Sequence, residues 1–236
     1  MGLIEMKTFI LNEIRKRENE YLANPVRAEQ DYNRENEDKE SYHGRELLEL
    51  LQNADDEIND LNKSSVKIKL VNNTLTISND GNPFSKEGIV SLMYSNVSPK
   101  RENNKVIGNK GTGFRSVLSW AKEIRIDSAD LHVRFTPEYS QKKLNRIFRT
   151  NKINKKQKAA VLAFPEWRDT NRKMKYTTEI SLIVKDDDAK SDIYHQMINI
   201  DGEILLFLNN ISELVIETDD TINTIRKIEL EKVTSI

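Results

Sequence analysis

The chain has 236 residues, which corresponds to one or two ordinary domains, and its composition is 32% charged and 37% apolar. The formal net charge of −1 argues against a protein that binds nucleic acid over its whole surface, and no apolar run approaches the ~20 residues that a membrane-spanning helix needs. Cysteine is absent, which excludes disulfide scaffolds, catalytic thiols and thiolate zinc sites. The N-terminus lacks a signal-peptide pattern, so we expect a cytoplasmic protein.

The first 41 residues divide into two parts. Apolar side chains at helical spacing predict an amphipathic helix over residues 3–22, which Asn24 and Pro25 end. Residues 27–41 are almost wholly polar and carry both charge signs. This pattern favours a solvated connector over a binding tail.

The segment 44–62 is the most regular predicted helix. Its apolar residues fall on one stripe that should face a core: Leu47, Leu50, Leu51, Ala54, Ile58 and Leu61. Glu49, Asn53 and Asp56 follow at positions i, i+4 and i+7, so three polar side chains stack along a neighbouring face. A carboxylate can polarise a water for attack on phosphorus, and an Asn oxygen is a suitable Mg²⁺ ligand.

After this helix, apolar and polar residues alternate with a period of two, which predicts a β-hairpin. Apolar residues alternate with lysines over 66–70, an Asn-Asn pair turns the chain, and the alternation returns over 75–77. The second strand ends in a tight polar turn at 78–81 (Ser-Asn-Asp-Gly). Ser85 is then typical of the N-cap of a short helix through Met93.

A glycine-rich segment follows a loop predicted over residues 95–107. Its sequence, Gly108-Asn-Lys-Gly111-Thr-Gly113-Phe114, leads directly into a predicted helix. Such spacing lets backbone N–H groups approach phosphate oxygens, and the helix N-terminus adds partial positive charge. The segment is neither a Walker A loop nor a Rossmann fingerprint, and alone it could be an ordinary glycine-rich turn.

The remaining elements interleave without strict βαβ regularity. We expect a helix near 187–200 and strands at 123–127, 131–135, 160–164, 178–184, 204–208, 213–217 and 225–232. Several of these strands pair as hairpins, which favours an α+β layer sandwich over a doubly wound parallel sheet.

Residues 141–158 carry eight Lys or Arg side chains and no acidic one. This run, Lys142 to Lys158, could meet the phosphate backbone of a nucleic acid, although Phe148 is its only aromatic residue. A solvated loop or helix face is the favoured interpretation.

Three motifs in this order resemble the GHKL superfamily, the Bergerat-fold ATPases of gyrase B, the ninety-kilodalton heat-shock chaperones, histidine kinases and MutL. They are Glu-x-x-x-Asn on a helix, Asn-Asp-Gly at a strand end, and Gly-x-x-Gly-x-Gly opening a helix. The likeness is greatest to the sacsin-like and NO VEIN-like branch of heat-shock-type domains, in the segments 42–56, 107–117 and 205–211.

The resemblance implies a two-layer Bergerat sandwich with a mixed, mostly antiparallel sheet and helices on one face. It assigns residues 1–41 to an N-terminal helix and polar connector, and 42–211 to the nucleotide-binding domain. Residues 212–236 would form C-terminal strands, which could begin a further domain.

Roles carried over from the family fall first on the 44–62 helix. Glu49 matches the general base, Asn53 the magnesium ligand, and Asp56 the acidic residue near the adenine pocket.

The adenine pocket would take residues from two strand ends. Asn79 stands where the family has the Asp that accepts the adenine amino group, and Asp80 follows it. Gly81 would permit close approach of the base, and Thr178 resembles the threonine that lines the pocket. Because an Asn amide can also donate, adenine selectivity is less secure than phosphate binding.

The phosphates would lie against the glycine-rich segment, with residues 95–107 as the mobile lid. The nucleotide-contacting set there is Gly108, Lys110, Gly111, Thr112, Gly113 and Phe114. Lys110 and Arg115 could touch phosphates or remain solvated.

The resemblance implies an ATP·Mg²⁺-binding ATPase with lid closure and a possible nucleotide-dependent homodimer, within a larger chaperone-like or antiviral-defence machine. Hydrolysis should be slow, because relatives complete the site with a Lys or Arg from a following domain. One alternative is a non-hydrolysing nucleotide-binding interaction module. A histidine-kinase domain is disfavoured, since such domains carry Asn at the position of Glu49 and no phosphoacceptor-His helix precedes the motif.

Overall fold

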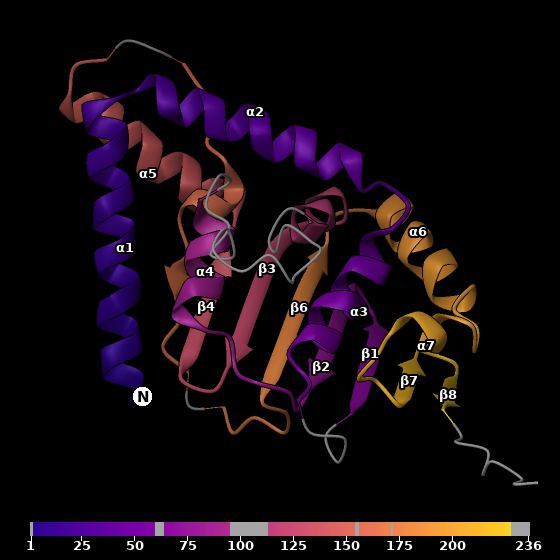
Figure 1. Cartoon of the computed structure of the whole chain (residues 1–236). Coiled ribbons are helices and arrows are strands. Elements are labelled where there is room, and N and C mark those ends of the chain that lie inside the picture. Colours follow the sequence, from indigo (N-terminus) through magenta and orange to yellow (C-terminus); the bar gives the residue numbers. More distant parts are fainter. Residues whose placement is uncertain (1, 60–63, 95–112, 154–155, 171, 228–236) are drawn as a thin grey trace, which may run out of the picture.

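The described strands form a single sheet. The structure is a computed structural model, and it describes residues 2–59, 64–94, 113–153, 156–170 and 172–227. The spatial order is β5-β4-β3-β6-β2-β1-β7-β8 (Figure 1), in which β1 and β7 run parallel and the other described neighbours run antiparallel. The strands are β1 (Ser65–Val71), β2 (Thr74–Asn79), β3 (Ala121–Ser128), β4 (Leu131–Phe135), β5 (Glu166–Trp167), β6 (Thr178–Val184), β7 (Glu213–Glu217) and β8 (Ile222–Arg226).

The sheet has one apolar and one polar face. On β1, Val66 and Ile68 are buried, while Lys67 and Lys69 alternate with them and pair with Glu217 of β7 on the opposite face. The helices lie on the apolar face (Figure 1). The predicted α+β sandwich with a mostly antiparallel sheet is therefore confirmed.

The helices that cover the sheet come from all parts of the chain. They are α1 (Leu3–Ala23), α2 (Val26–Ser41), α3 (Glu46–Asp56), α4 (Lys86–Met93), α5 (Pro137–Thr150), α6 (Asp187–Ile198) and α7 (Ile204–Phe207), with 3₁₀ helices η2 (Gly113–Ser119) and η3 (Val161–Ala163). The predicted N-cap of α4 is confirmed, since the Ser85 hydroxyl accepts a hydrogen bond from the Gly88 N–H at 2.9 Å. Within the described ranges, no helix is long and apolar enough to cross a membrane.

Three predicted segments have a different structure. Residues 160–164 and 204–208 contain the short helices η3 and α7 in place of strands, because short apolar runs do not distinguish helix from strand. The predicted connector 27–41 is wrong, since it forms the helix α2 with a buried stripe. The last predicted strand begins earlier, at Ile222, and its end lies outside the described residues.

The buried stripe of α2 is mostly acidic. Besides Ala28 it consists of Asp31, Glu35 and Asp38, each no more than 6% exposed. Burying carboxylates is costly unless they are paired or hydrogen-bonded, so α2 requires partners inside the core. Two fully buried arginines, Arg17 and Arg115, stand among these carboxylates.

Arg17 joins α1, α2 and the end of α4. Its guanidinium lies 2.8 Å from the Asp31 carboxylate and donates a hydrogen bond to the Met93 carbonyl at 2.8 Å. It also lies over the rings of Tyr21 and Tyr94, 4.9 and 4.2 Å from their centroids. One side chain therefore satisfies a buried carboxylate and a helix C-terminal carbonyl together.

Glu35 and Asp38 extend the same network toward η2 and η3. Glu35 accepts hydrogen bonds from two backbone N–H groups of η3 at 2.6 and 2.9 Å. Arg115 lies 3.7 Å from Asp38 and donates to the Leu92 carbonyl at 3.0 Å. Burial raises the pKa of both Glu35 and Asp38. These contacts cross the predicted domain boundary at residue 42, and that division stays a prediction.

We expect the replacement Arg17→Leu to lower the free energy of unfolding by about 3–5 kcal/mol, because it leaves the Asp31 carboxylate buried without its closest cation. Urea denaturation measures the loss. The matched control is Lys7→Leu, which removes an exposed ion pair with Asp169 and should cost less than about 1 kcal/mol. Similar losses in the two variants would contradict a dominant role for the buried pair.

Candidate functional site

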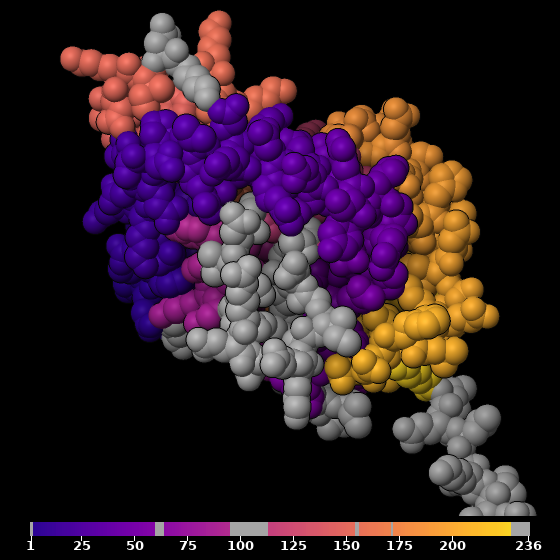
Figure 2. All heavy atoms as spheres, turned by 45° about the horizontal axis from the view of Figure 1, so that its top comes forward, coloured from indigo at the N-terminus to yellow at the C-terminus, as the bar shows by residue number. Residues whose placement is uncertain are grey.

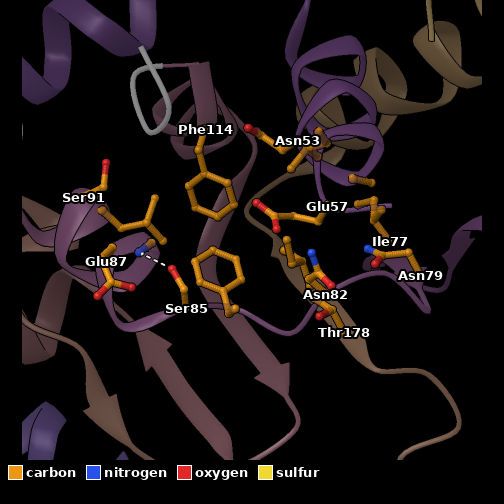
Figure 3. Close-up of a pocket in the computed structure, with 16 residues that line it drawn as sticks. Asn53, Glu57, Ile77, Asn79, Asn82, Ser85, Glu87, Ser91, Phe114 and Thr178 are labelled. Atoms are coloured by element: carbon orange, nitrogen blue, oxygen red, sulfur yellow. Dashed lines mark hydrogen bonds between the residues drawn. The ribbon is translucent and has the colours of Figure 1, made fainter. Parts of the chain in front are cut away.

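A cavity of about 270 Å³ lies between α3, α4, η2 and the ends of β2 and β6 (Figure 3). Its walls are largely apolar and include Leu50, Ala54, Ile77, Phe84, Leu92, Phe114 and Ile180. Polar side chains gather on two sides of the space (Figure 3): Asn53, Glu57, Asn79, Asn82 and Thr178 on one, Ser85, Glu87 and Ser91 on the other. An apolar slot with a few polar groups suits a flat, partly polar ligand.

The inner end of the cavity is built from the ends of three strands. The register places Asn79, Thr178 and Ser128 side by side on the face that is otherwise apolar. The Thr178 and Ser128 hydroxyls are 2.7 Å apart, and Ser128 also accepts a hydrogen bond from the Phe84 N–H. The Asn79 Oδ1 accepts from the Gly81 N–H at 3.1 Å, whereas its Nδ2 has no hydrogen-bond partner among the described residues. Asn79 therefore offers a donor to the cavity.

Three side chains of α3 and its C-terminal turn are spaced along the cavity. Asn53 lines it, Glu49 stands one helical turn earlier, and Glu57 stands one turn later. In Figure 3 the Asn53 side chain extends toward Phe114 and the Glu57 carboxylate reaches into the space. The cavity wall thus carries the Asn53 carboxamide and the Glu57 carboxylate, and the Glu49 carboxylate adjoins it.

Glu49 lies against the first residue of η2. A Cβ atom added at Gly113 would lie 2.0 Å from the Glu49 Oε2, so any larger residue would require the Glu49 side chain to move from this position. The Glu49 side chain is 15% exposed, and the Arg45 guanidinium lies 3.8 Å from its Oε1. Burial raises the pKa of Glu49, and Arg45 partly opposes this effect. A carboxylate that is more basic than an exposed one suits a general base.

Three predicted site residues, Asp56, Asp80 and Gly81, lie outside the cavity lining, and two of them make specific contacts elsewhere. Asp56 is exposed, whereas its neighbour Asp55 is buried and accepts hydrogen bonds from the backbone N–H groups of 209–211. Asp80 accepts a hydrogen bond from the Thr177 N–H at 2.9 Å. Gly81 packs on the Glu57 carbonyl, which a Cβ atom would approach to 2.6 Å, so this contact explains the glycine.

The structure brings most other predicted residues together. Asn53, Asn79, Phe114 and Thr178 line the cavity, and Glu49 and Gly113 adjoin it. Arg115 is 2% exposed and holds the end of α4, so the alternative that it is solvated is wrong. The loop 95–107 and Gly108, Lys110, Gly111 and Thr112 lie outside the described residues.

The sequence analysis missed Glu57, Phe84 and Leu92. Glu57 follows Asn53 by four residues, so the i, i+4 spacing that singled out Glu49 would also have found it. Phe84 precedes α4 and Leu92 lies on it, where the apolar face of an amphipathic helix is expected to pack against a neighbouring element. Only the tertiary structure shows that they face α3 across a cavity.

A second cluster of possible metal ligands lies away from the cavity. Ligand atoms of His43, Glu46 and Asp192 lie within 4.8 Å of one another. The two carboxylates already accept hydrogen bonds. Glu46 accepts one from the Gln196 amide, and Asp192 accepts one from the Trp120 Nε1–H, each at 2.7 Å. The cluster therefore serves to join α3, α6 and the start of β3.

Comparisons with known proteins give no independent identification. No protein-family model matches the chain, and no curated protein matches it in sequence. The resemblance to GHKL ATPases therefore rests on the order of three motifs in the sequence.

We expect the pKa of Glu49 to lie above that of an exposed glutamate, because its carboxylate is partly buried against Gly113. The replacement Arg45→Gln should raise it further, since the opposing positive charge is lost. A pH titration of carboxyl-labelled Glu by NMR measures both shifts. Arg34→Gln, which removes an arginine of α2 paired with Asp38, should leave the Glu49 titration unchanged. A Glu49 pKa that does not respond to Arg45→Gln would contradict the assignment.

Proposed function

We propose that the chain is an ATP·Mg²⁺-binding ATPase module of the GHKL type. The observation that carries the proposal is the convergence of two motifs and the last residues of a third, Gly113 and Phe114, from separate parts of the sequence. The α3 motif, the end of β2 and the start of η2 meet around one cavity, with Thr178 from a fourth segment beside them. Unrelated surface motifs would have no reason to meet in this way.

The cavity suits the base of a nucleotide. Its apolar walls, with Phe114 on one side and Ile180 on another, can enclose a flat ring. At the strand ends, Asn79 and Thr178 present polar groups that can hydrogen-bond a base edge, and the Glu57 carboxylate can accept from an amino group or a sugar hydroxyl. The base would therefore lie at the inner end of the cavity, next to the sheet, and the phosphates would point toward Gly113.

The phosphate end offers the groups that hydrolysis needs. Asn53 supplies an oxygen ligand for Mg²⁺, which when bound neutralises charge that develops on the phosphates. Glu49 stands one turn away and can take a proton from a water that attacks the terminal phosphorus, while ADP leaves with the bridging oxygen. Its raised pKa fits this role.

The resemblance to GHKL ATPases also supports a proposal about the conformational cycle of the module and its biological setting. Nucleotide binding would close a lid formed by residues 95–107, could favour a homodimer, and would serve a larger multidomain machine of chaperone-like or antiviral-defence type. In the families that the chain resembles, a Lys or Arg from a following domain completes the site, so hydrolysis by the described site alone would be slow.

The first test is direct titration of the purified chain with ATP and Mg²⁺ by calorimetry. Absence of binding at millimolar ATP would refute the nucleotide site. Binding without turnover would instead favour a non-hydrolysing interaction module.

We expect Glu49→Ala to leave ATP affinity nearly unchanged and to lower turnover by roughly 10²–10⁴-fold, because the general base is lost. Parent turnover should fall as the pH falls through the Glu49 pKa, at a higher pH than for an exposed glutamate, since the base acts only when ionised. The matched control is Glu87→Ala, which removes a carboxylate from the opposite side of the cavity. Equal phosphate release by the parent and Glu49→Ala would remove Glu49 from the mechanism.

We expect Asn79→Asp to raise the ratio of ATP to GTP affinity about tenfold. An aspartate accepts a hydrogen bond from the adenine amino group but repels the guanine O6, whereas the Asn79 amide can donate to guanine. The new carboxylate can still accept from the Gly81 N–H, so the turn is retained. Competition binding measures the ratio, with Asn82→Asp at the exposed edge of the cavity as control. An unchanged ratio would place the base edge away from residue 79.

A further inference from the structure

A basic surface runs along the exposed side of α5 and the segment that follows it. We call it the α5 basic surface, and its members are Lys142, Arg146, Arg149, Lys152, Lys156 and Lys158. All six are exposed, and none of them forms an ion pair with another described residue. In Figure 2 the coral spheres of this part of the chain project from the molecule beyond α1 and α2.

The charge of this surface is locally uncompensated. No acidic residue occurs between Glu138 and Lys158, and Lys143 is the one cation of the described run that turns inward, to pair with Glu18 of α1 at 2.8 Å. Elsewhere, exposed cations are often paired, as Arg226 is with Glu213. A net charge of −1 for the whole chain therefore conceals a strongly positive region.

Helix electrostatics account for only part of the pattern. Cations near a helix C-terminus are stabilised by the helix dipole, which applies to Arg149 and Lys152 at the end of α5. Lys142 lies in the first half of the helix, and Lys156 and Lys158 lie beyond its end. These positions need another explanation.

We propose that the α5 basic surface binds the phosphate backbone of nucleic acid. Lys142, Arg146 and Arg149 follow at i, i+4 and i+7, so they form one stripe about 10 Å long. A duplex presents a phosphate for about every 1.7 Å of its axis, so such a stripe faces several phosphates at once. Charge complementarity, and not a shaped pocket, supports this partner.

The burial pattern of α5 favours nucleic acid over a membrane. Its apolar side chains Leu144, Ile147 and Phe148 all pack in the core, which leaves no apolar group on the exposed side to enter a bilayer. Because Phe148 is buried, the described surface also offers no aromatic ring for stacking on bases. Binding should therefore be independent of sequence and similar for DNA and RNA.

The test is fluorescence anisotropy with labelled duplex DNA and RNA of random sequence at increasing salt. If three to six phosphates are neutralised, the slope of log K against log[salt] is about −2.7 to −5.4, which is roughly a 40- to 2,000-fold loss from 50 to 200 mM salt. Absence of binding at 50 mM salt, or binding that salt does not weaken, would overturn the proposal.

A matched pair of triple variants locates the surface. Lys142→Gln with Arg146→Gln and Arg149→Gln should flatten the slope by about 2.7 and weaken binding at 50 mM salt at least tenfold. Lys122→Gln with Lys173→Gln and Lys175→Gln removes the same charge from exposed positions elsewhere and should bind nearly as the parent does. Circular dichroism confirms that both variants fold. Equal weakening by the two triple variants would mean that net charge, and not this surface, drives binding.

Two further ligands separate nucleic acid from other anions. Phosphatidylserine vesicles and poly-glutamate should bind at least tenfold more weakly than the duplex at equal charge concentration. Stronger binding to vesicles would assign the surface to a membrane, and equal binding to poly-glutamate would assign it to acidic chains in general. ATP titration is a separate measurement, so failure of the nucleotide site and failure of this surface are distinguishable.

Discussion

The buried ion pairs between α2 and two arginines are the interaction on which the site depends. Arg17 and Arg115 each neutralise a carboxylate of α2 and also bind a backbone carbonyl at the end of α4. Because α4 forms one wall of the cavity and Arg115 directly follows Phe114, the same charges hold two walls in place. Breaking either ion pair would leave a buried charge without its partner, so the network resists displacement of α2 and α4.

Besides these buried ion pairs, close contacts at two glycines hold the elements of the site together. Gly113 touches the Glu49 carboxylate, and Gly81 touches the Glu57 carbonyl, so no side chain separates α3 from η2 or from the turn after β2. At Gly81 the absence of a Cβ atom allows backbone to meet backbone, and at Gly113 it leaves room for the Glu49 carboxylate in its present position. Close-packed contacts bring a carboxylate, a carboxamide and a glycine within reach of one ligand.

The sheet and the motif positions could be predicted because they depend on local patterns. Alternation over 66–70 and the i, i+4 spacing of Glu49 and Asn53 correspond directly to β1 and to α3. The burial of one side of α2 could not be predicted from the sequence, because a stripe of acidic residues is typical of an exposed helix face. Only the structure shows that Arg17 and Arg115 face this stripe. Likewise, Asp55 and Asp56 are identical in type, and only the packing of 209–211 decides which of them is buried.

The acidic stripe of α2 also sets an order of events during synthesis. Asp31 pairs with Arg17, which leaves the ribosome before it, but Glu35 leaves long before its partner, the Val161 N–H, at a separation of 126 residues. Arg17 likewise waits for the Met93 carbonyl, 76 residues downstream. At about 5–20 residues per second, α2 waits several seconds in water as a polar, solvated segment. A helix whose core-facing side is charged is safe in that interval, because it exposes no apolar surface to aggregate until the chain that completes it has emerged.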